Sequence, residues 1–347
     1  MSVQDLRIGV IGVGMMGADH AERVVNRVAG ARLVAVADPD TARADQLAAS
    51  FDGVRSIGDP LALVADPEVD AVIIASPGFV HEEQVLACLE HGKYALCEKP
   101  LTMDSESSLR LVEAEAKGGR PLVQVGFMRR FDPEYAQLKA MLDSGQFGRT
   151  LLLHNTHRNA TVPDTFRSEM IVRDSLVHEV DVARFVFGEE IVEITVLAGT
   201  PTGVAAEGVL DPQVSLFRMA GGGLVTSEVF VNCRVGYEVR CEAVAERGTV
   251  VAGQNSTGIY STVADERGGY WGGQVPPDFR VRFARAYDLE VQAWVDASRR
   301  GEVVGPTSWD GYAATAVCTA GMESLATGLP VKVDLADRAT VLGGAAR

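Results

Sequence analysis

The stretch that decides the fold reads Val10-Ile11-Gly12-Val13-Gly14-Met15-Met16-Gly17, which is a G-x-G-x-x-G run. Leu6 to Ile11 is apolar enough for a buried strand, and Met15 to Val28 is expected to form a helix. Glycines at such a turn allow a tight connection and let the backbone approach a pyrophosphate, which the helix N-terminus then binds. A second apolar strand, Leu33 to Ala37, is followed by Asp38. A carboxylate roughly 20 residues after the glycines is typical of a dinucleotide-binding site.

Asp38 also indicates which dinucleotide the site prefers. A carboxylate at the end of the second strand accepts hydrogen bonds from the ribose hydroxyls of NAD and repels the additional phosphate of NADP. Pro39 and Asp40 come next, so no arginine follows Asp38 directly. We therefore expect NAD as the cofactor. A solvated aspartate in a turn before a proline is the alternative.

The composition excludes several classes of protein. A chain of 347 residues, 47% of them hydrophobic, is expected to form two domains with substantial cores. It has no apolar run long enough for a membrane span and no leader with a basic and then an apolar part, so we expect a cytoplasmic protein without a membrane partner. The net charge is −15, without a basic stripe, which argues against a nucleic-acid partner. The five cysteines are widely spaced without a C-x-x-C pair, which favours reduced thiols and no structural zinc.

Apolar strands and helical segments alternate through the first part of the chain. Such a succession predicts a doubly wound parallel sheet, and we assign residues 1–123 to an NAD-binding Rossmann domain. The further strands are expected at Ala71–Ala75, Tyr94–Cys97 and Leu122–Val125, and the helices at Pro60–Ala65, His81–His91 and Ser105–Lys117.

The pattern changes in the remainder, which we assign to a second domain over residues 124–347. From Ile191 to Val251 apolar and polar residues alternate, and Gly221-Gly222-Gly223 separates two such runs as in a hairpin. The expected architecture is α+β with an open, mostly antiparallel sheet. A strand is expected at Leu151–Thr156, helices at Asp132–Asp143, Asp174–Phe187, Ala284–Arg299 and Asp310–Thr327, a long loop at Asn255–Asp278, and a frayed end at Asp337–Arg347.

Cys97-Glu98-Lys99-Pro100 stands at the carboxyl end of a predicted parallel strand, the edge at which open α/β sheets bind ligands. A lysine there can hold a substrate hydroxyl and stabilise a developing alkoxide. Pro100 is expected to fix a bend, cis or trans, that aims Lys99. The alternative is an exposed lysine before a helix.

The second candidate cluster runs from Asp174 to Asp181. Asp174 and His178 are four residues apart, hence on one face of the predicted helix, and Asp181 follows three residues later. A histidine flanked by carboxylates is suited to accept the hydroxyl proton when an alcohol is dehydrogenated. A helix face with ordinary ion pairs is the alternative.

His154-Asn155-Thr156-His157-Arg158-Asn159, expected off the end of a strand, is dense in hydrogen-bond donors and acceptors. Such a segment suits a ligand with many hydroxyls. A metal site made by His154, His157, Asp174 and His178 is the competing interpretation. Because residues three apart on a strand point to opposite faces, we expect no metal site.

The chain resembles the Gfo/Idh/MocA oxidoreductase family, and within it the inositol dehydrogenases, over nearly its whole length. Glu98-Lys99-Pro100 is the motif most specific to the family. One departure is Phe131, where some inositol enzymes have tyrosine. The other matching motifs are Gly12 to Gly17, Ser76-Pro77, Gly126 to Asp132, His157-Arg158-Asn159 and Asp174 to Asp181.

The resemblance implies a role for individual residues. Lys99, Asp174 and His178 would form the catalytic set. The cofactor-binding set would be Gly12, Gly14, Met15, Met16, Gly17, Asp38, Ser76, Pro77, His81, Glu98 and Lys99. The substrate-binding set would be Lys99, Met128, Arg129, His157, Asp174, His178, Asp181 and Tyr237, with Trp271 as a further candidate contact. The second domain would bind the substrate, and its open sheet would build a homo-oligomer, a tetramer or a dimer.

The expected activity is the NAD-dependent oxidation of a ring hydroxyl of a cyclitol, with myo-inositol oxidised to 2-keto-myo-inositol. The same chemistry on scyllo-inositol or a pyranose sugar is the alternative substrate assignment. A non-catalytic, NAD-binding regulatory protein is the alternative from another class.

Overall fold

The computed structural model describes residues 5–253 and 275–343. These residues form two compact units. The first unit comprises residues 5–128, 287–315 and 335–343, and the second comprises 129–253, 275–286 and 316–334. The chain therefore leaves the first unit and later returns to it. The division into an NAD-binding domain up to residue 123 and a substrate-binding domain from residue 124 stays a prediction.

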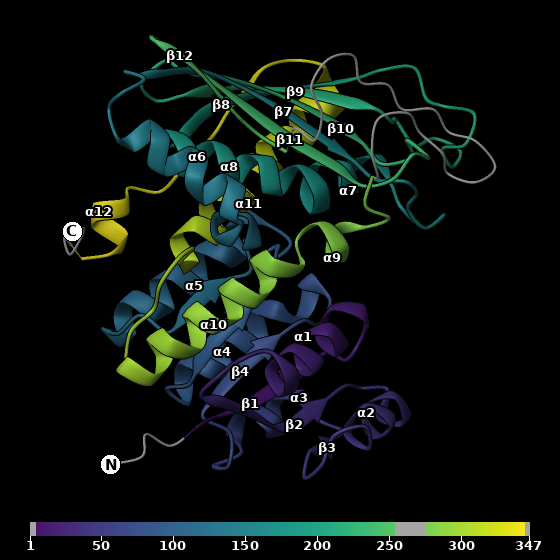
Figure 1. The fold of residues 1–347 in the computed structure, drawn as a ribbon, viewed down its shortest axis with the longest axis vertical. Helices are drawn as coiled ribbons and strands as arrows, with labels where there is room; N and C mark the ends of the chain where they lie inside the picture. The colour runs from purple at the N-terminus through teal and green to yellow at the C-terminus, as the bar shows by residue number, and fades with distance from the viewer. Residues whose placement is uncertain (1–4, 254–274, 344–347) are drawn as a thin grey trace. The chain divides into compact units, whose positions relative to one another are not determined.

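The first unit is built on a parallel sheet with the strand order β3-β2-β1-β4-β5-β6 (Figure 1). This is the order of a doubly wound dinucleotide-binding fold, so the predicted fold class is confirmed. The central strand β4 is entirely apolar and buried, and the last four residues of β1 are buried, as expected for strands covered on both faces. The strands are β1 (Leu6–Ile11), β2 (Ala31–Ala37), β3 (Arg55–Ile57), β4 (Ala71–Ile74), β5 (Tyr94–Cys97) and β6 (Val123–Val125).

The helices of the first unit begin at capping residues that the sequence supplies. Asp40, Asp59 and Asp104 each accept a hydrogen bond from a backbone N–H in the first turn of the helix that follows. The helical segments are α1 (Met15–Asn26), α2 (Thr41–Ala48), α3 (Pro60–Ala65), η1 (Gly78–Val80), α4 (His81–Glu90), α5 (Ser105–Gly118) and α12 (Arg338–Val341).

Most of α10 (Ala284–Arg300) and the start of α11 (Ser308–Thr327) also belong to the first unit. The buried Trp294 of α10 joins the same apolar core as Val24 of α1 and Ile8 of β1. In Figure 1, α10 runs beside α1 on one side of the sheet. A segment nearly 300 residues along the chain thus completes the core of the N-terminal fold.

The second unit contains a sheet with the strand order β12-β11-β7-β10-β9-β8-β13. It is mostly antiparallel, as predicted, but β7 and β10 pair in parallel. The Gly221–Gly223 segment does connect an antiparallel pair, β9 and β10. The strands are β7 (Thr150–Arg158), β8 (Ile191–Ala198), β9 (Gln213–Met219), β10 (Leu224–Phe230), β11 (Glu238–Ala245), β12 (Gly248–Ala252) and β13 (Val331–Lys332).

Helices lie on one side of this sheet, where Figure 1 shows α6 and α8 together. Asp132 starts α6 by accepting the N–H groups of Glu134 and Tyr135. The opposite side carries exposed residues that alternate with buried ones along β9. The helical segments are η2 (Met128–Phe131), where the units meet in the sequence, α6 (Pro133–Asp143), α7 (Ser168–Met170), η3 (Ile171–Leu176), α8 (Val177–Phe187) and α9 (Phe279–Arg282).

Three expectations differ from the structure. The helix predicted from Asp174 begins as the π-helical turn η3 and becomes α-helical only at Val177. The strand predicted to end at Thr156 continues to Arg158, because pairing with both β10 and β11 extends that far. Part of the expected frayed end forms the short helix α12, which Asp337 caps. The long loop predicted at Asn255–Asp278 lies mostly outside the described residues, and Trp271 lies wholly outside them.

Candidate active site

Each glycine of the turn between β1 and α1 has a different steric environment. Gly12 has a φ of +80°, and a Cβ there would lie 2.5 Å from the backbone of Ser76. A Cβ on Gly17 would lie 1.7 Å from the carbonyl oxygen of Gly12. A Cβ on Gly14 would meet no atom within 4 Å. Two glycines therefore permit close packing, and the third keeps open space at the helix N-terminus.

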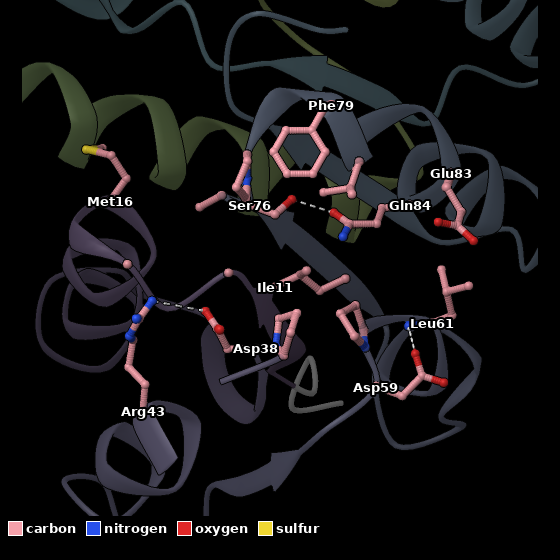
Figure 2. Close-up of a pocket in the computed structure, with 17 residues that line it drawn as sticks. Ile11, Met16, Asp38, Arg43, Asp59, Leu61, Ser76, Phe79, Glu83 and Gln84 are labelled. Carbon is pink, nitrogen blue, oxygen red and sulfur yellow. Dashed lines mark hydrogen bonds and ion pairs between the residues drawn. The ribbon is translucent and has the colours of Figure 1, made fainter. Parts of the chain in front are cut away.

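A cavity of about 680 Å³ opens at this turn (Figure 2). Gly14 lines it at the N-cap of α1, where no side chain caps the helix. The first-turn N–H groups of α1 are thus suited to a phosphate. The residues lining the cavity include Gly12, Gly14, Met16, Asp38, Ser76 and Pro77 from the predicted cofactor set, together with Pro39, Arg43, Pro60, Leu61, Phe79, Glu83 and Gln84.

Asp38 is held rigidly at the end of β2. Its Oδ2 accepts the N–H of Val13 at 2.9 Å, and its Oδ1 accepts the N–H of Asp40 at 2.9 Å. Each carboxylate oxygen has a second lone pair with which it can accept a hydroxyl hydrogen bond. Arg43 of α2 points toward Asp38, with Nη1 3.9 Å from Oδ2 (Figure 2). Sequence reasoning considered only the residues directly after Asp38, so it missed this arginine.

The loop after β4 contributes Ser76 and Pro77 to the cavity wall. Ser76 Oγ lies 2.6 Å from Gln84 Oε1, a contact that the sequence did not indicate. His81 is buried, and its two ring nitrogens lie 2.9 Å and 2.8 Å from the carbonyl oxygens of Pro100 and Ser76. Burial lowers the pKa of His81, although the contacts with those carbonyls oppose the shift. His81 therefore joins the loop after β4 to the loop after β5.

Glu98 and Lys99 follow β5 at the same edge of the sheet. The carboxylate of Glu98 is buried and lies 2.9 Å from Nε2 of His20, a residue of α1 that sequence reasoning did not select. Burial alone would raise the pKa of Glu98, but contacts with His20 and Lys99 outweigh it and lower that pKa. The Lys99–Pro100 peptide bond is cis. Glu98 thus connects the helix of the glycine turn to the backbone that carries Lys99.

The second unit holds Asp174 and His178. Asp174 lies in η3, where its two carboxylate oxygens are 2.7 Å and 2.8 Å from Nε and Nη2 of Arg173. His178 lies in the first turn of α8 and is buried. π-helical turns inside helices occur frequently at functional sites because they displace side chains from the regular α-helical positions. The sequence identified both residues but missed the π-helical turn and Arg173.

Four buried polar side chains from separate segments meet beside His178. Glu179 of α8 forms an ion pair with Nη1 of Arg129 and lies 3.1 Å from Nδ1 of His157. Nη2 of Arg129 lies 3.3 Å from the same nitrogen, and the ring centroid of Tyr237 lies 5.5 Å from that of His157. The rings of His157 and His178 have centroids 6.2 Å apart. Three predicted substrate residues, Arg129, His157 and Tyr237, are therefore brought together, whereas Glu179 was not selected.

The charges of this cluster are mutually stabilised. Burial disfavours the charged forms of Glu179 and Arg129. Arg129 and His157 outweigh the effect of burial on Glu179 and lower its pKa to about 2. Glu179 and two tyrosines likewise raise the pKa of Arg129 despite its burial. Burial raises the pKa of Tyr237, so its hydroxyl keeps its proton at neutral pH.

Asp181 and Met128 complete the predicted substrate set. Asp181 is buried, with both oxygens 3.1 Å from Nε of Arg130, and Arg130 stacks over Phe185 at 5.5 Å. Met128 is buried at the last residue of the first unit. The Arg130–Asp181 pair could not be predicted from local sequence patterns, because its members are 51 positions apart.

His154 and His157 lie on opposite faces of β7, the first exposed and the second buried. Within residues 5–253 and 275–343, no three His, Cys, Asp or Glu side chains are close enough together to hold a metal ion. None of the helices described there is both long and apolar enough to cross a membrane.

Comparison with known proteins finds family matches in both parts of the chain. Residues 6–127 match the oxidoreductase family with an NAD-binding Rossmann fold, and residues 135–251 match the GFO/IDH/MocA C-terminal domain. The chain belongs to the Gfo/Idh/MocA oxidoreductase family. The first match covers the glycine turn, Asp38 and Glu98-Lys99-Pro100, and the second covers His157, Asp174 and His178.

Relatives of the same size extend the comparison. An inositol 2-dehydrogenase of Mycolicibacterium smegmatis is 53% identical, over 98% of this chain and 100% of the relative. The myo-inositol dehydrogenase of Lactobacillus casei, solved in complex with NAD(H) and myo-inositol, is 32% identical with a TM-score of 0.90, over 98% of this chain and 100% of the other. The scyllo-inositol dehydrogenase of the same organism is 25% identical with a TM-score of 0.84, over 95% of this chain and 99% of the other.

Proposed function

We propose that this protein is an NAD-dependent dehydrogenase that oxidises a ring hydroxyl of a cyclitol, converting myo-inositol to 2-keto-myo-inositol. The observation that carries the proposal is full-length similarity to inositol 2-dehydrogenases, at 53% identity in one relative. Proteins with scyllo-inositol as the ligand are similar at lower identity, so scyllo-inositol remains the second candidate substrate.

The cavity of the first unit has the features that NAD requires. Gly14 leaves room for a pyrophosphate at the N-terminus of α1, and Asp38 is positioned to accept the ribose hydroxyls. Met15, Met16 and Gly17 supply the first turn of that helix, while Ser76 and Pro77 form part of the cavity wall. When bound, NAD supplies the hydride acceptor.

The chain's own residues supply the acid–base chemistry. We assign His178 as the base that takes the hydroxyl proton and Asp174 as the residue that tunes it. Lys99 stabilises the charge that develops on the reacting oxygen, because an ammonium group favours an alkoxide. Glu98 and His81 act through their neighbours, since both are buried and bonded to other parts of the first unit.

The second unit supplies hydrogen-bonding groups suited to a ring polyol. His157, Asp181, Tyr237 and Arg129 of this unit are polar and buried and make up the proposed wall. Met128, the last residue of the first unit, is a further proposed substrate contact. A site built to bind hydroxyls rejects analogues without them, because its own polar groups would then be left unpaired. The wall therefore favours inositols over simple secondary alcohols.

The outer face of the second unit's sheet supports assembly into a homotetramer. Buried and exposed residues alternate along β9, and two of its three exposed residues, Val214 and Leu216, are apolar, as at a subunit interface. The five cysteines are unpaired thiols, which is consistent with a cytoplasmic location. The exposed apolar residues of this sheet include Leu197, Val214, Leu216 and Val251.

The test is a rate assay with purified enzyme and NAD, in which NADH absorbance is followed with myo-inositol, scyllo-inositol, glucose, galactose and cyclohexanol. We expect rapid turnover of myo-inositol and hardly any of cyclohexanol. If the inositols are inert while an aldopyranose is turned over efficiently, the inositol assignment is wrong and the family assignment stands.

A further inference from the structure

Glu179 is a fully buried carboxylate to which the proposed chemistry assigns no role. It lies in α8 directly after His178, the proposed base. Its two oxygens have separate partners, because Oε1 pairs with Arg129 and Oε2 lies 3.1 Å from Nδ1 of His157. Removing a carboxylate from water is costly unless it is paired, so both contacts are needed to hold the charge there.

The contact with His157 determines which ring nitrogen carries the proton. Two groups lie near Nδ1 of His157, and they favour opposite tautomers: Oε2 of Glu179, at 3.1 Å, can only accept a hydrogen, and Nη2 of Arg129, at 3.3 Å, can only donate one. The carboxylate contact is the shorter, and an unprotonated Nδ1 would place two acceptors against each other, whereas the guanidinium already has an acceptor in Oε1 of Glu179. In the neutral ring Nδ1 therefore carries the hydrogen that Oε2 accepts. Nε2 then presents a lone pair. A histidine whose Nδ1–H is fixed by a carboxylate has one tautomer and one ring orientation.

The tautomer of His157 matters because its ring lies beside the proposed base. Its ring packs edge-on against Tyr237, with centroids 5.5 Å apart, and against His178, with centroids 6.2 Å apart. It therefore lies beside the base, in the proposed polyol wall. An Nε2 lone pair accepts a hydrogen bond from a substrate hydroxyl, whereas the opposite tautomer would present a donor there.

We propose that Glu179 is a positioning residue for substrate recognition, because its carboxylate fixes His157 in the tautomer that accepts a hydrogen bond from a ring hydroxyl of the polyol. The proposal rests on the proposed function insofar as the ligand is a polyol. Arg129 has a supporting role, since its guanidinium holds the other oxygen of Glu179 and thereby orients the carboxylate.

Glu179→Gln separates this role from simple packing. The amide has nearly the same shape, but it has one acceptor oxygen and one donor nitrogen. Arg129 can only donate, so it takes the amide oxygen and leaves the NH₂ group facing Nδ1 of His157. The NH₂ group donates to Nδ1 and drives the proton to Nε2, which reverses the tautomer.

The first measurement is nitrogen-15 NMR of histidine-labelled enzyme with NAD bound and no polyol present. The chain has only six histidines, and His157→Asn identifies the signal of His157. We expect the Nδ1–H tautomer in the wild type and the Nε2–H tautomer in Glu179→Gln. An Nε2–H tautomer in the wild type would overturn the proposal without any Glu179 variant, so a variant that fails to fold leaves it testable.

The second measurement is the split between KM and kcat for myo-inositol. We expect Glu179→Gln to raise KM about tenfold, to change kcat less, and to leave KM for NAD near the wild-type value. Glu179→Asp keeps the charge and should recover part of the lost affinity. Glu190→Gln, which removes the partner of Arg184 at the end of the same helix, is the matched control and should leave KM unchanged.

The two measurements distinguish the possible failures. A reversed tautomer with an unchanged KM for myo-inositol would show that Glu179 does not act on substrate recognition, and the proposal would be wrong. If no cyclitol is oxidised by the wild type, the proposed function fails, while the NMR measurement still decides whether Glu179 fixes His157.

Discussion

The glycine turn after β1 and the cluster around Glu179 are both candidate binding regions, but they are shaped by different physical forces. At the turn, the absence of side chains creates the site, because a Cβ on Gly12 or Gly17 would collide with the backbone. In the cluster, buried charges from η2, β7 and α8 hold one another in place. Backbone shape is thus encoded locally, whereas the charge network exists only once distant segments have folded together.

The largest expected effect is a loss of kcat that leaves NAD binding unchanged. His178→Ala should lower kcat by roughly 10²- to 10⁴-fold, the usual range for loss of a positioned acid–base group. The dissociation constant of NAD should stay near the wild-type value, because His178 belongs to the second unit and the cavity to the first. Steady-state kinetics and NAD titration measure both, with the exposed His91→Ala as a control. A variant that keeps more than about a third of the wild-type kcat would remove His178 from the mechanism, provided that chemistry limits the rate.

The next comparison lies within the turn itself. Gly17→Ala should lower the free energy of unfolding by about 3 kcal/mol, because its methyl group would overlap the carbonyl of Gly12. Gly14→Ala has open space around the new methyl group, so it should leave stability almost unchanged and weaken NAD binding instead. Urea unfolding and NAD titration of both variants test this contrast. Equal losses of stability would contradict the distinct reasons given for the two glycines.

A smaller effect concerns cofactor choice at Asp38. The kcat/KM for NAD should exceed the kcat/KM for NADP by at least about tenfold, which corresponds to a free-energy difference of about 1.4 kcal/mol. Asp38→Ser should narrow the ratio, because it removes the repulsive carboxylate and leaves Arg43 close to the additional phosphate of NADP. The double variant Asp38→Ser with Arg43→Ala should use NADP less well than Asp38→Ser alone. Equal use of both cofactors by the wild type would refute the role given to Asp38.

The smallest effect is the acid sensitivity of the cluster. The pKa of Glu179 is lowered to about 2, so its ion pairs add stability above the unfolded value of about 4.3. That contribution is lost as the pH falls toward 2. Unfolding free energies measured between pH 5 and pH 2 should therefore decline less steeply in Glu179→Gln than in the wild type. Parallel declines would mean that Glu179 is not held as a buried anion.

The difference between the regions also explains what could be predicted from the sequence. The strand, the glycines and Asp38 are close together along the chain. Their spacing alone was enough to predict the fold of the first unit and the edge of its sheet at which the cofactor binds. Arg43, His20 and Glu179 were missed, because each acquires its role only from a contact made in the folded chain. The π-helical turn was missed because hydrophobic spacing does not distinguish it from the adjoining α-helix.

The most direct test of the central claim uses myo-inositol that carries deuterium on carbon 2. The enzyme is incubated with this substrate and NAD, and the NADH that forms is analysed by mass spectrometry. The account predicts NADH that carries one deuterium, together with 2-keto-myo-inositol as the product. NADH without deuterium, formed at an undiminished rate, would show that a different ring carbon is oxidised and would contradict the assignment.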